Sequence, residues 1–119
     1  MRLLTSSQQS QACLYYGIPD WPSMQFLRHY LRPGDLCADI GANVGIYSLL
    51  MARQAGAANV HAFECLPANI PKLRANLRLN RLEAVSVHEL ALADRDGLVL
   101  LHASDGDSTA SFSPPTRPR

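Results

Sequence analysis

Two acidic residues and the glycines between them have the clearest chemical meaning in this sequence. The run Asp39-Ile-Gly-Ala-Asn-Val-Gly45 follows a short apolar segment, and Glu64 lies 25 residues after Asp39. Glycines permit a tight turn from a strand into a helix, and an acid ending the next strand can accept hydrogen bonds from ribose hydroxyls. The spacing therefore indicates a site for a nucleoside-containing cofactor at the edge of a Rossmann-like sheet.

The glycine pattern separates two classes of cofactor. A dinucleotide site uses GxGxxG, in which the second glycine lets the backbone approach a pyrophosphate. Here Asn43 and Ile46 occupy the second and third glycine positions. S-adenosylmethionine (SAM) carries no pyrophosphate, and its carboxylate suits the free N–H groups of a helix N-terminus. The turn therefore favours SAM. The alternative is a nicotinamide- or flavin-binding protein, and the side chains of Asn43 and Ile46 argue against it.

Each acidic residue has an expected role and a simpler interpretation. We expect Asp39 to hold the turn or the ammonium group of the cofactor, and Glu64 to hold the ribose. Cys65 and Leu66 would then lie near the adenine. Asp39 alone is also compatible with a capping residue, and Glu64 alone with a solvated strand end. Their order and spacing together favour the cofactor site.

The elements that must position these residues follow from periodicity and turn signals. The sequence predicts a helix that opens at Pro22-Ser23 and a β-α-β-α-β series, which is typical of a parallel sheet with right-handed crossovers. A helical face in the first helix is predicted for Met24, Phe26, Leu27, Tyr30 and Leu31. Strands are expected at 36–40, 59–63 and 85–90, helices at 44–54 and 67–80, and an extra antiparallel strand at 98–101. The predicted fold class is α/β, an incomplete Rossmann-like sheet with helices on both faces.

Three regions are expected along the chain. Residues 1–32 form an N-terminal segment with a helix, 33–103 form the cofactor-binding half of a domain, and 104–119 form a polar tail that we expect to be disordered. At 119 residues the chain is at most one domain. A net charge of +1 gives no indication of nucleic acid or of an acidic membrane surface.

The cysteines and the apolar runs limit the class of protein further. Cys13, Cys37 and Cys65 have neither CxxC nor metal-ligand spacing, which indicates reduced thiols in a cytoplasmic protein without a metal. No secretory signal and no run long enough to span a membrane is recognisable. Three histidines in or beside predicted strands, His61, His88 and His102, are interpreted as structural or surface residues rather than as catalytic bases.

The segment Asp39-Ile-Gly-Ala-Asn-Val-Gly-Ile-Tyr-Ser48 resembles the first motif of the FkbM-type SAM-dependent methyltransferases. The likeness spans residues 24–112 approximately. Its other parts are Arg32-Pro33-Gly34-Asp35, Ala62-Phe63-Glu64, Pro67, Asn76, Leu79-Asn80, Ala91-Leu-Ala-Asp94 and Gly97.

This resemblance implies a class I methyltransferase fold, SAM as cofactor and O-methylation of a hydroxyl on a sugar or another small molecule. By position, it implies that Asp39, Gly41, Asn43 and Gly45 contact or shape the methionine end of SAM. It also implies that Glu64 holds the ribose and that Ala91 and Leu92 line the adenine side. Cys65 stands where the family usually has proline.

The resemblance also implies a C-terminal half with further strands and a Lys-Ile-Asp-x-Glu-Gly-like segment, which the sequence lacks. We therefore expect a truncated cofactor-binding half whose catalytic residues cannot be assigned. The alternative is a catalytically inactive SAM-binding remnant or interaction module. An open edge on the first strand would then favour self-association.

Overall fold

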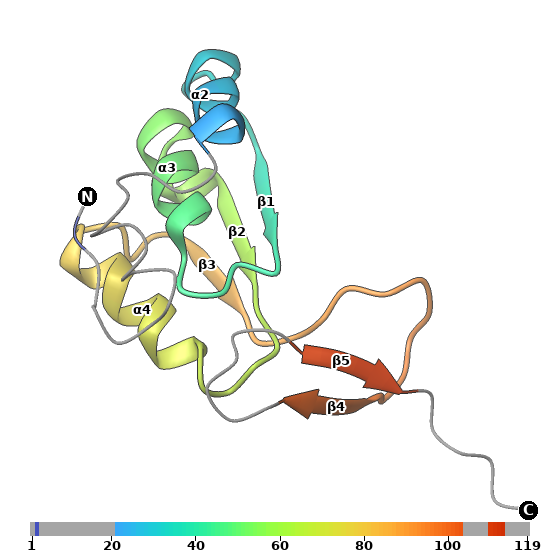
Figure 1. The fold of residues 1–119 in the computed structure, drawn as a ribbon. Coiled ribbons are helices and arrows are strands. Elements are labelled where there is room, and N and C mark those ends of the chain that lie inside the picture. The colour runs from blue at the N-terminus through green and yellow to red at the C-terminus, as the bar shows by residue number, and fades with distance from the viewer. Residues whose placement is uncertain (1, 3–20, 104–109, 114–119) are drawn as a thin grey trace, which may run out of the picture.

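The computed structural model describes residues 2, 21–103 and 110–113 (Figure 1). Helices α2 (Trp21–Tyr30), α3 (Ile46–Ala55) and α4 (Ile70–Leu79) and the short 3-10 helix η1 (Ala57–Asn59) lie among five strands. The strands are β1 (Cys37–Ile40), β2 (Val60–Phe63), β3 (Ser86–His88), β4 (Leu100–Ala103) and β5 (Ala110–Ser113).

Strands β1, β2 and β3 form a parallel sheet in that order, as the alternation of elements predicts. Each of these three strands lies within the range expected from the sequence. Helix α4 begins at Ile70 rather than near Pro67 because the backbone first turns through residues 66–69, where Asn69 N–H donates to the Leu66 carbonyl at 3.0 Å. The predicted fold class, an incomplete Rossmann-like α/β sheet, is confirmed.

Alternate strand residues divide the sheet into a covered and an open face. Cys37, Val60 and Ala62 are buried against Leu49 of α3 and Leu73 of α4. The open face is formed by the intervening residues, which are exposed or half-buried: Ala38, Ile40, His61, Phe63, Ser86 and His88. The crossover helices α3 and α4 pack on one face only, where the sequence predicted helices on both. Right-handed crossovers between strands added in one direction place successive helices on the same side.

Helix α2 packs on α3 through a small second cluster of buried residues. Met24 is buried with Val44 and Ile46. Phe26 and Tyr30, predicted to share one face of this helix, stack on each other, and 61% and 66% of their surfaces are exposed. Burial in α2 is therefore concentrated at Met24, whose side chain is 3% exposed.

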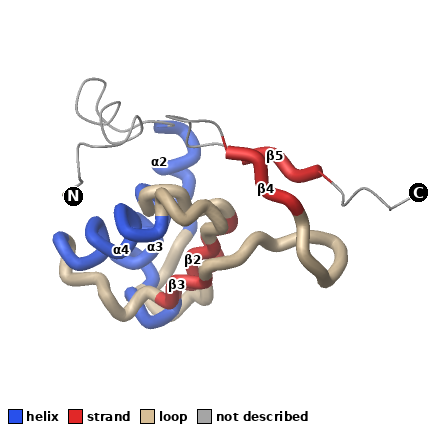
Figure 2. The backbone as a smooth tube through the Cα atoms, turned by 90° about the horizontal axis from the view of Figure 1, so that it is seen from below, coloured by secondary structure: helices blue, strands red, loops and turns tan. Residues whose placement is uncertain are grey.

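The extra strand predicted at 98–101 is present as β4, which begins two residues later and lies outside the main sheet. It pairs antiparallel with β5 in a separate two-stranded sheet (Figure 2). Strand β5 falls within the 104–119 tail for which disorder was expected, and the rest of that tail lies outside the described residues. The N-terminal segment 1–32 is described only at residue 2 and from residue 21. No helix in the described part of the chain is long and apolar enough to cross a membrane.

Candidate functional site

A cavity of about 240 Å³ lies at the carboxyl ends of the parallel strands. Its lining combines the loops after β1, β2 and β3 with the ends of the first two strands. The lining residues are Ile40, Gly41, Asn43, Phe63, Glu64, Cys65, Leu66, Leu90, Ala91 and Leu92. Small-molecule sites usually enclose about 300–1,000 Å³, so this cavity has room for part of a cofactor-sized ligand.

Six of the eight residues predicted to bind a cofactor line this cavity, and two do not. The six are Gly41, Asn43, Glu64, Cys65, Ala91 and Leu92. The other two, Asp39 and Gly45, are not among the lining residues. The structure therefore brings the ends of three separate strands together, as expected of an open α/β sheet.

Glu64 is the central polar group of the cavity and is buried, with 5% of its surface exposed. Its Oε2 accepts a hydrogen bond from the Asn43 backbone N–H at 2.7 Å, and its Oε1 accepts one from the Leu66 N–H at 2.8 Å. A carboxylate has about four acceptor positions, so both oxygens retain a lone pair. The side chain thus ties two loops together and still has capacity for hydroxyl donors.

The loop after β1 continues the hydrogen bonding of the sheet into the cavity. The N–H groups of Gly41 and Ala42 both donate to the Phe63 carbonyl at 2.9 Å. Gly41 has a positive φ of 77°, and a Cβ added there would meet no atom within 4 Å. Asn43 also adopts the left-handed conformation, with φ of 54°. The backbone therefore turns sharply at Gly41, and the space next to this turn is not filled by other protein atoms.

Gly45 performs a packing role at the start of α3. Its φ is 93°, and a Cβ built on it would lie 2.5 Å from Cδ1 of Leu73 in α4. Such a contact is shorter than van der Waals packing permits. Gly45 therefore lets two helices approach each other and only indirectly shapes the cavity.

Asp39 is buried and does not line this cavity; it lines a second one, together with residues of α2 and α3. Its Oδ2 accepts a hydrogen bond from the Ser48 hydroxyl at 2.5 Å, and the Ser48 backbone N–H also donates to it. Burial raises the pKa of the Asp39 carboxyl above its ordinary value of 3.8, the bonds from Ser48 oppose this, and the charge of Glu64 adds to it. Asp39 therefore ties the end of β1 to the first turn of α3.

The remaining wall of the cavity is apolar apart from one thiol. Leu92 exposes 48% of its surface, and Ala91 is exposed beside it. Burial raises the pKa of the Cys65 thiol, and the neighbouring charge of Glu64 raises it further. The cavity thus has one acidic side chain and no basic one.

Two side chains that hold the loop were not given roles from the sequence. Asn76 of α4 is fully buried, and its Nδ2 donates to the Val44 carbonyl at 2.7 Å. Ser48 is also fully buried and donates to Asp39 as described above. Both residues are among those that carry the FkbM-type resemblance. Their partners can be identified only in the folded structure, in which α4 lies beside α3.

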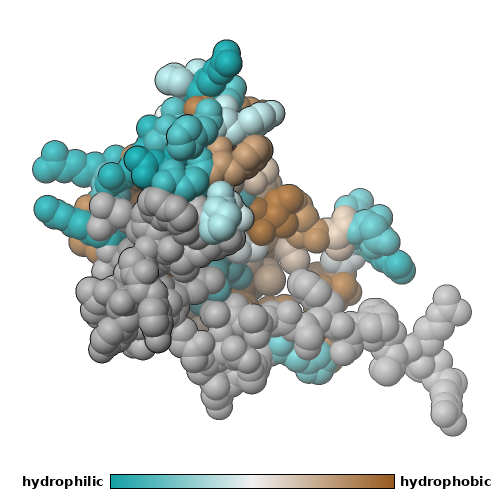
Figure 3. Space-filling model, turned by 45° about the horizontal axis from the view of Figure 1, so that its top comes forward, coloured by the Kyte–Doolittle hydropathy of each residue, from teal (hydrophilic) through white to brown (hydrophobic). Residues whose placement is uncertain are grey.

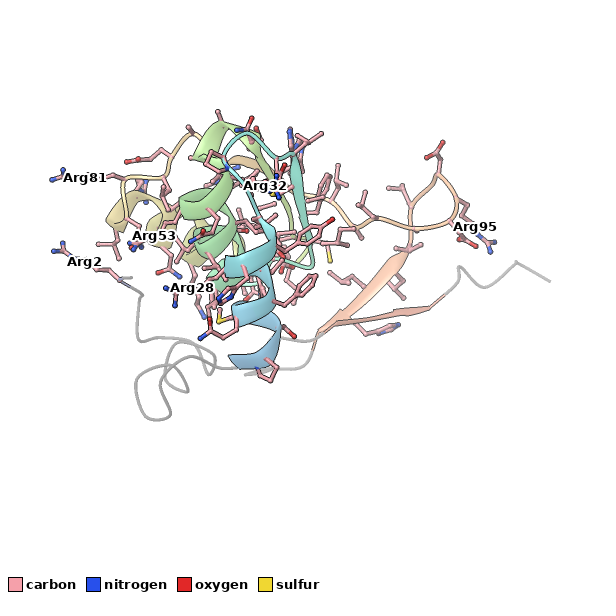
Figure 4. The ribbon with its side chains drawn as sticks, turned by 90° about the horizontal axis from the view of Figure 1, so that it is seen from above. Arg2, Arg28, Arg32, Arg53, Arg81 and Arg95 are labelled. Atoms are coloured by element: carbon pink, nitrogen blue, oxygen red, sulfur yellow. The ribbon has the colours of Figure 1, made fainter. Side chains whose placement is uncertain are left out.

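None of the basic side chains that the structure describes lines the cavity. Figure 4 shows Arg2, Arg53 and Arg81 pointing outward near the ends of α3 and α4, and Arg95 out on the connection between β3 and β4. Within the described residues, no cluster of three or more histidine, cysteine, aspartate or glutamate side chains could hold a metal ion. The chemistry of the cavity is therefore that of hydrogen-bond acceptance and apolar contact.

Known proteins with similar sequences are methyltransferases, although no family model matches the chain. The chain is 40% identical over 75 residues to the 31-O-demethyl-FK506 methyltransferase FkbM of Streptomyces tacrolimicus, which covers 61% of this chain and 28% of that protein. It is 36% identical over 62 residues to the ribosomal protein L11 methyltransferase of Geobacillus kaustophilus, covering 52% and 20%. The chain thus spans less than a third of the length of either curated relative.

Solved structures with the same arrangement are also methyltransferases. An rRNA methylase from Streptococcus thermophilus superposes with a TM-score of 0.56 at 19% identity, over 61% of this chain and 39% of that one. Precorrin-6y C5,15-methyltransferase from Geobacter metallireducens gives 0.50 at 23% identity, over 75% and 41%. The predicted resemblance to FkbM-type methyltransferases is confirmed, and the strands and helices are those of one half of a class I methyltransferase fold.

Proposed function

We propose that this chain binds SAM at the carboxyl ends of β1, β2 and β3, as the cofactor-binding half of a methyltransferase. The observation that carries the proposal is Glu64: a buried carboxylate, fixed by two backbone N–H groups, in the wall of the cavity. Such a group retains acceptor capacity for the two ribose hydroxyls of a nucleoside.

The residues around Glu64 fit the other parts of SAM. Leu66, Leu90 and Leu92 offer apolar contact for an adenine ring. The open space over Gly41 admits a ligand close to the backbone. We assign Asp39 and Gly45 an indirect role, because they hold the turn that carries Gly41 and Asn43. Asn43 stands where a dinucleotide site has the glycine that lets the backbone approach a pyrophosphate, which makes a dinucleotide the poorer fit.

When bound, SAM supplies an electrophilic methyl group that a nucleophile displaces from the sulfonium. The contribution of this chain is to hold the nucleoside and to keep water from one side of it, so that catalysis rests on proximity and orientation. The acceptor that we propose is the hydroxyl of a small molecule or sugar. The relative most similar in sequence among those described is named for O-methylation of a small molecule. The cavity itself offers no cation for an RNA phosphate.

Replacing Glu64 tests the cofactor site. Glu64→Gln keeps the shape of the side chain but offers one acceptor oxygen instead of two, and we expect at least tenfold weaker binding of SAM by isothermal titration calorimetry. Glu83→Gln is the matched control, because Glu83 is exposed in the turn after α4. Equal SAM affinity of the Glu64 variant and the wild type would remove the basis of the proposal, and binding of NADH but not SAM would favour the dinucleotide alternative.

A second candidate function is protein association, favoured by the exposed edge of β1. Among the described residues this strand pairs only with β2, and Leu36 before it and Ile40 at its end expose 79% and 65% of their surfaces. Figure 3 shows apolar side chains gathered on the surface between the helical body and the distant hairpin. Open edges of this kind pair with other chains.

Sedimentation at increasing protein concentration distinguishes this candidate. Association through β1 predicts a self-associating wild type and a monomeric Leu36→Lys variant. Leu98→Lys is the control, since Leu98 exposes 94% of its surface far from β1. A monomeric wild type at every concentration would exclude self-association.

A further inference from the structure

His61 of β2 and His88 of β3 are hydrogen-bonded on the open face of the sheet. The Nδ1 of His61 lies 3.0 Å from the Nε2 of His88, and the ring centroids are 5.3 Å apart. The two nitrogens therefore face each other along the line between the rings, where one ring donates a proton and the other accepts it. Which ring donates depends on the tautomers. This bond joins the two strands through their side chains, in addition to the backbone ladder between them.

The ring of His88 is also stacked on the ring of Phe63, its partner in the register of the two strands. The centroids of these two rings are 4.6 Å apart, and the ring planes differ by 15°. Stacking at such a distance is a favourable arrangement of aromatic rings. His61, His88 and Phe63 are all half-buried, so the three side chains form one ring cluster across β2 and β3.

His88 contacts the wall of the cofactor cavity at two points, although it is not itself among the lining residues. Its ring packs on Phe63, which lines the cavity, and its backbone carbonyl accepts a hydrogen bond from the Glu64 N–H at 3.0 Å. Leu90 follows two residues later in the chain and lines the cavity as well. The conformation of His88 therefore affects both the acidic group and the apolar wall that would meet a nucleoside.

The hydrogen bond to His61 restricts the rotation of the His88 ring. Without this bond the imidazole would be free to turn about its side-chain torsions, and Phe63 would lose a fixed stacking partner. Side chains that move freely before binding must be ordered when a ligand binds, which lowers affinity. The backbone ladder of β2 and β3 would persist, because its hydrogen bonds do not involve the rings. The bond between the rings therefore concerns the affinity of the cavity more than the existence of the sheet.

We propose that His88 is a positioning residue of the cofactor cavity and that His61 fixes the orientation of its ring. His88 acts through Phe63 and Glu64 and does not itself contact the cofactor. This inference rests on the proposed function, because it concerns the affinity of the same cavity for SAM. Ordering one side chain in advance corresponds to a gain in affinity of about three- to tenfold.

Two variants of His61 test the role of the hydrogen bond. In His61→Leu the bond is lost, and we expect about three- to tenfold weaker binding of SAM by isothermal titration calorimetry. In His61→Asn the side-chain amide can replace Nδ1 as donor or acceptor, so most of the wild-type affinity should return. His102→Leu is the matched control, since His102 is exposed on β4 and lies outside the ring cluster. This control should bind SAM as the wild type does.

The outcomes distinguish this inference from the proposed function. Failure of the wild-type chain to bind SAM would overturn both. Wild-type binding that is unchanged in a folded His61→Leu variant would overturn only the positioning role. Equal weakening in the His61→Leu and His61→Asn variants would also overturn it, because the hydrogen bond would then not be the cause.

Imidazole nitrogen NMR on the wild-type chain makes the test independent of whether the variants fold. Addition of SAM should shift the ring nitrogen signals of His88, although this residue does not line the cavity. The signals of His29 and His102, both exposed and outside the ring cluster, should not shift. Signals of His88 that do not respond while SAM binds would overturn the proposal.

Discussion

The Gly45→Ala variant tests packing separately from ligand binding, because two features of the structure determine the expected loss of stability. The added Cβ would lie 2.5 Å from Leu73 Cδ1, and the residue would keep a φ of 93°. Left-handed backbone costs a side-chain-bearing residue about 1–2 kcal/mol. Forcing extra volume into a packed core costs about 1–3 kcal/mol. We therefore expect the free energy of unfolding to fall by about 2–5 kcal/mol.

Gly41→Ala is the matched control for this prediction. Its φ of 77° gives a comparable backbone strain, but an added Cβ meets no atom within 4 Å. Only the strain term of about 1–2 kcal/mol should remain. Urea unfolding followed by circular dichroism measures both variants. The Gly41 variant should lose SAM binding while remaining folded, because its methyl group enters the cavity.

A double-variant cycle identifies the contact responsible. Leu73→Ala alone costs about 2–5 kcal/mol as a cavity-forming change in a fully buried side chain. It also removes the atom that the methyl group of the Gly45→Ala variant would strike. The combined variant should therefore be more stable than the sum of the two single effects predicts. Additive effects, or equal losses in the Gly45 and Gly41 variants, would refute the packing role assigned to Gly45.

Three further predictions concern the groups around the loop. Asn76→Ala leaves the buried Val44 carbonyl without its 2.7 Å donor and should lower the free energy of unfolding by about 1–3 kcal/mol in a urea titration; no loss would contradict the bond. Because burial raises the pKa of Asp39, its folded form binds a proton more readily than the unfolded chain. Wild-type stability relative to Asp39→Asn should therefore fall as pH rises from 3.8 through the folded pKa, and a difference independent of pH would contradict this. Because the pKa of the Cys65 thiol is raised, we expect it to be alkylated more slowly at pH 8 than a free thiol. Alkylation of Cys65 should be faster in the Glu64→Gln variant, which lacks the neighbouring charge. Mass spectrometry of tryptic peptides measures these rates, and the opposite order of rates would contradict the prediction.

The elements of the main sheet were predictable because their signals are local. Apolar runs bounded by turn residues, such as 36–40 and 59–63, matched β1 and β2 within one residue at the start. Gly41, Gly45 and Glu64 were recognisable since a tight turn and a strand-end acid leave a fixed spacing in the chain. Periodicity and turn chemistry were therefore sufficient for the order of elements and for the edge of the sheet that forms the cavity.

What the sequence could not provide depends on contacts between distant residues. The bond between Asp39 and Ser48 and the close approach of Gly45 to Leu73 of another helix both join residues that are separated in the sequence. Pairing of β4 with β5 joins segments that show no common pattern. The meeting of His61 and His88 needs the register of two strands, which periodicity alone does not fix.

The most direct test of the central claim is a two-dimensional amide NMR spectrum of the 119-residue chain with and without SAM. The account predicts dispersed signals, of which those of Gly41, Asn43, Glu64 and Leu66 shift on addition of SAM while those of the β4–β5 hairpin do not. A dispersed spectrum that does not respond to SAM would contradict the cofactor site, and a collapsed spectrum would contradict the fold on which it rests.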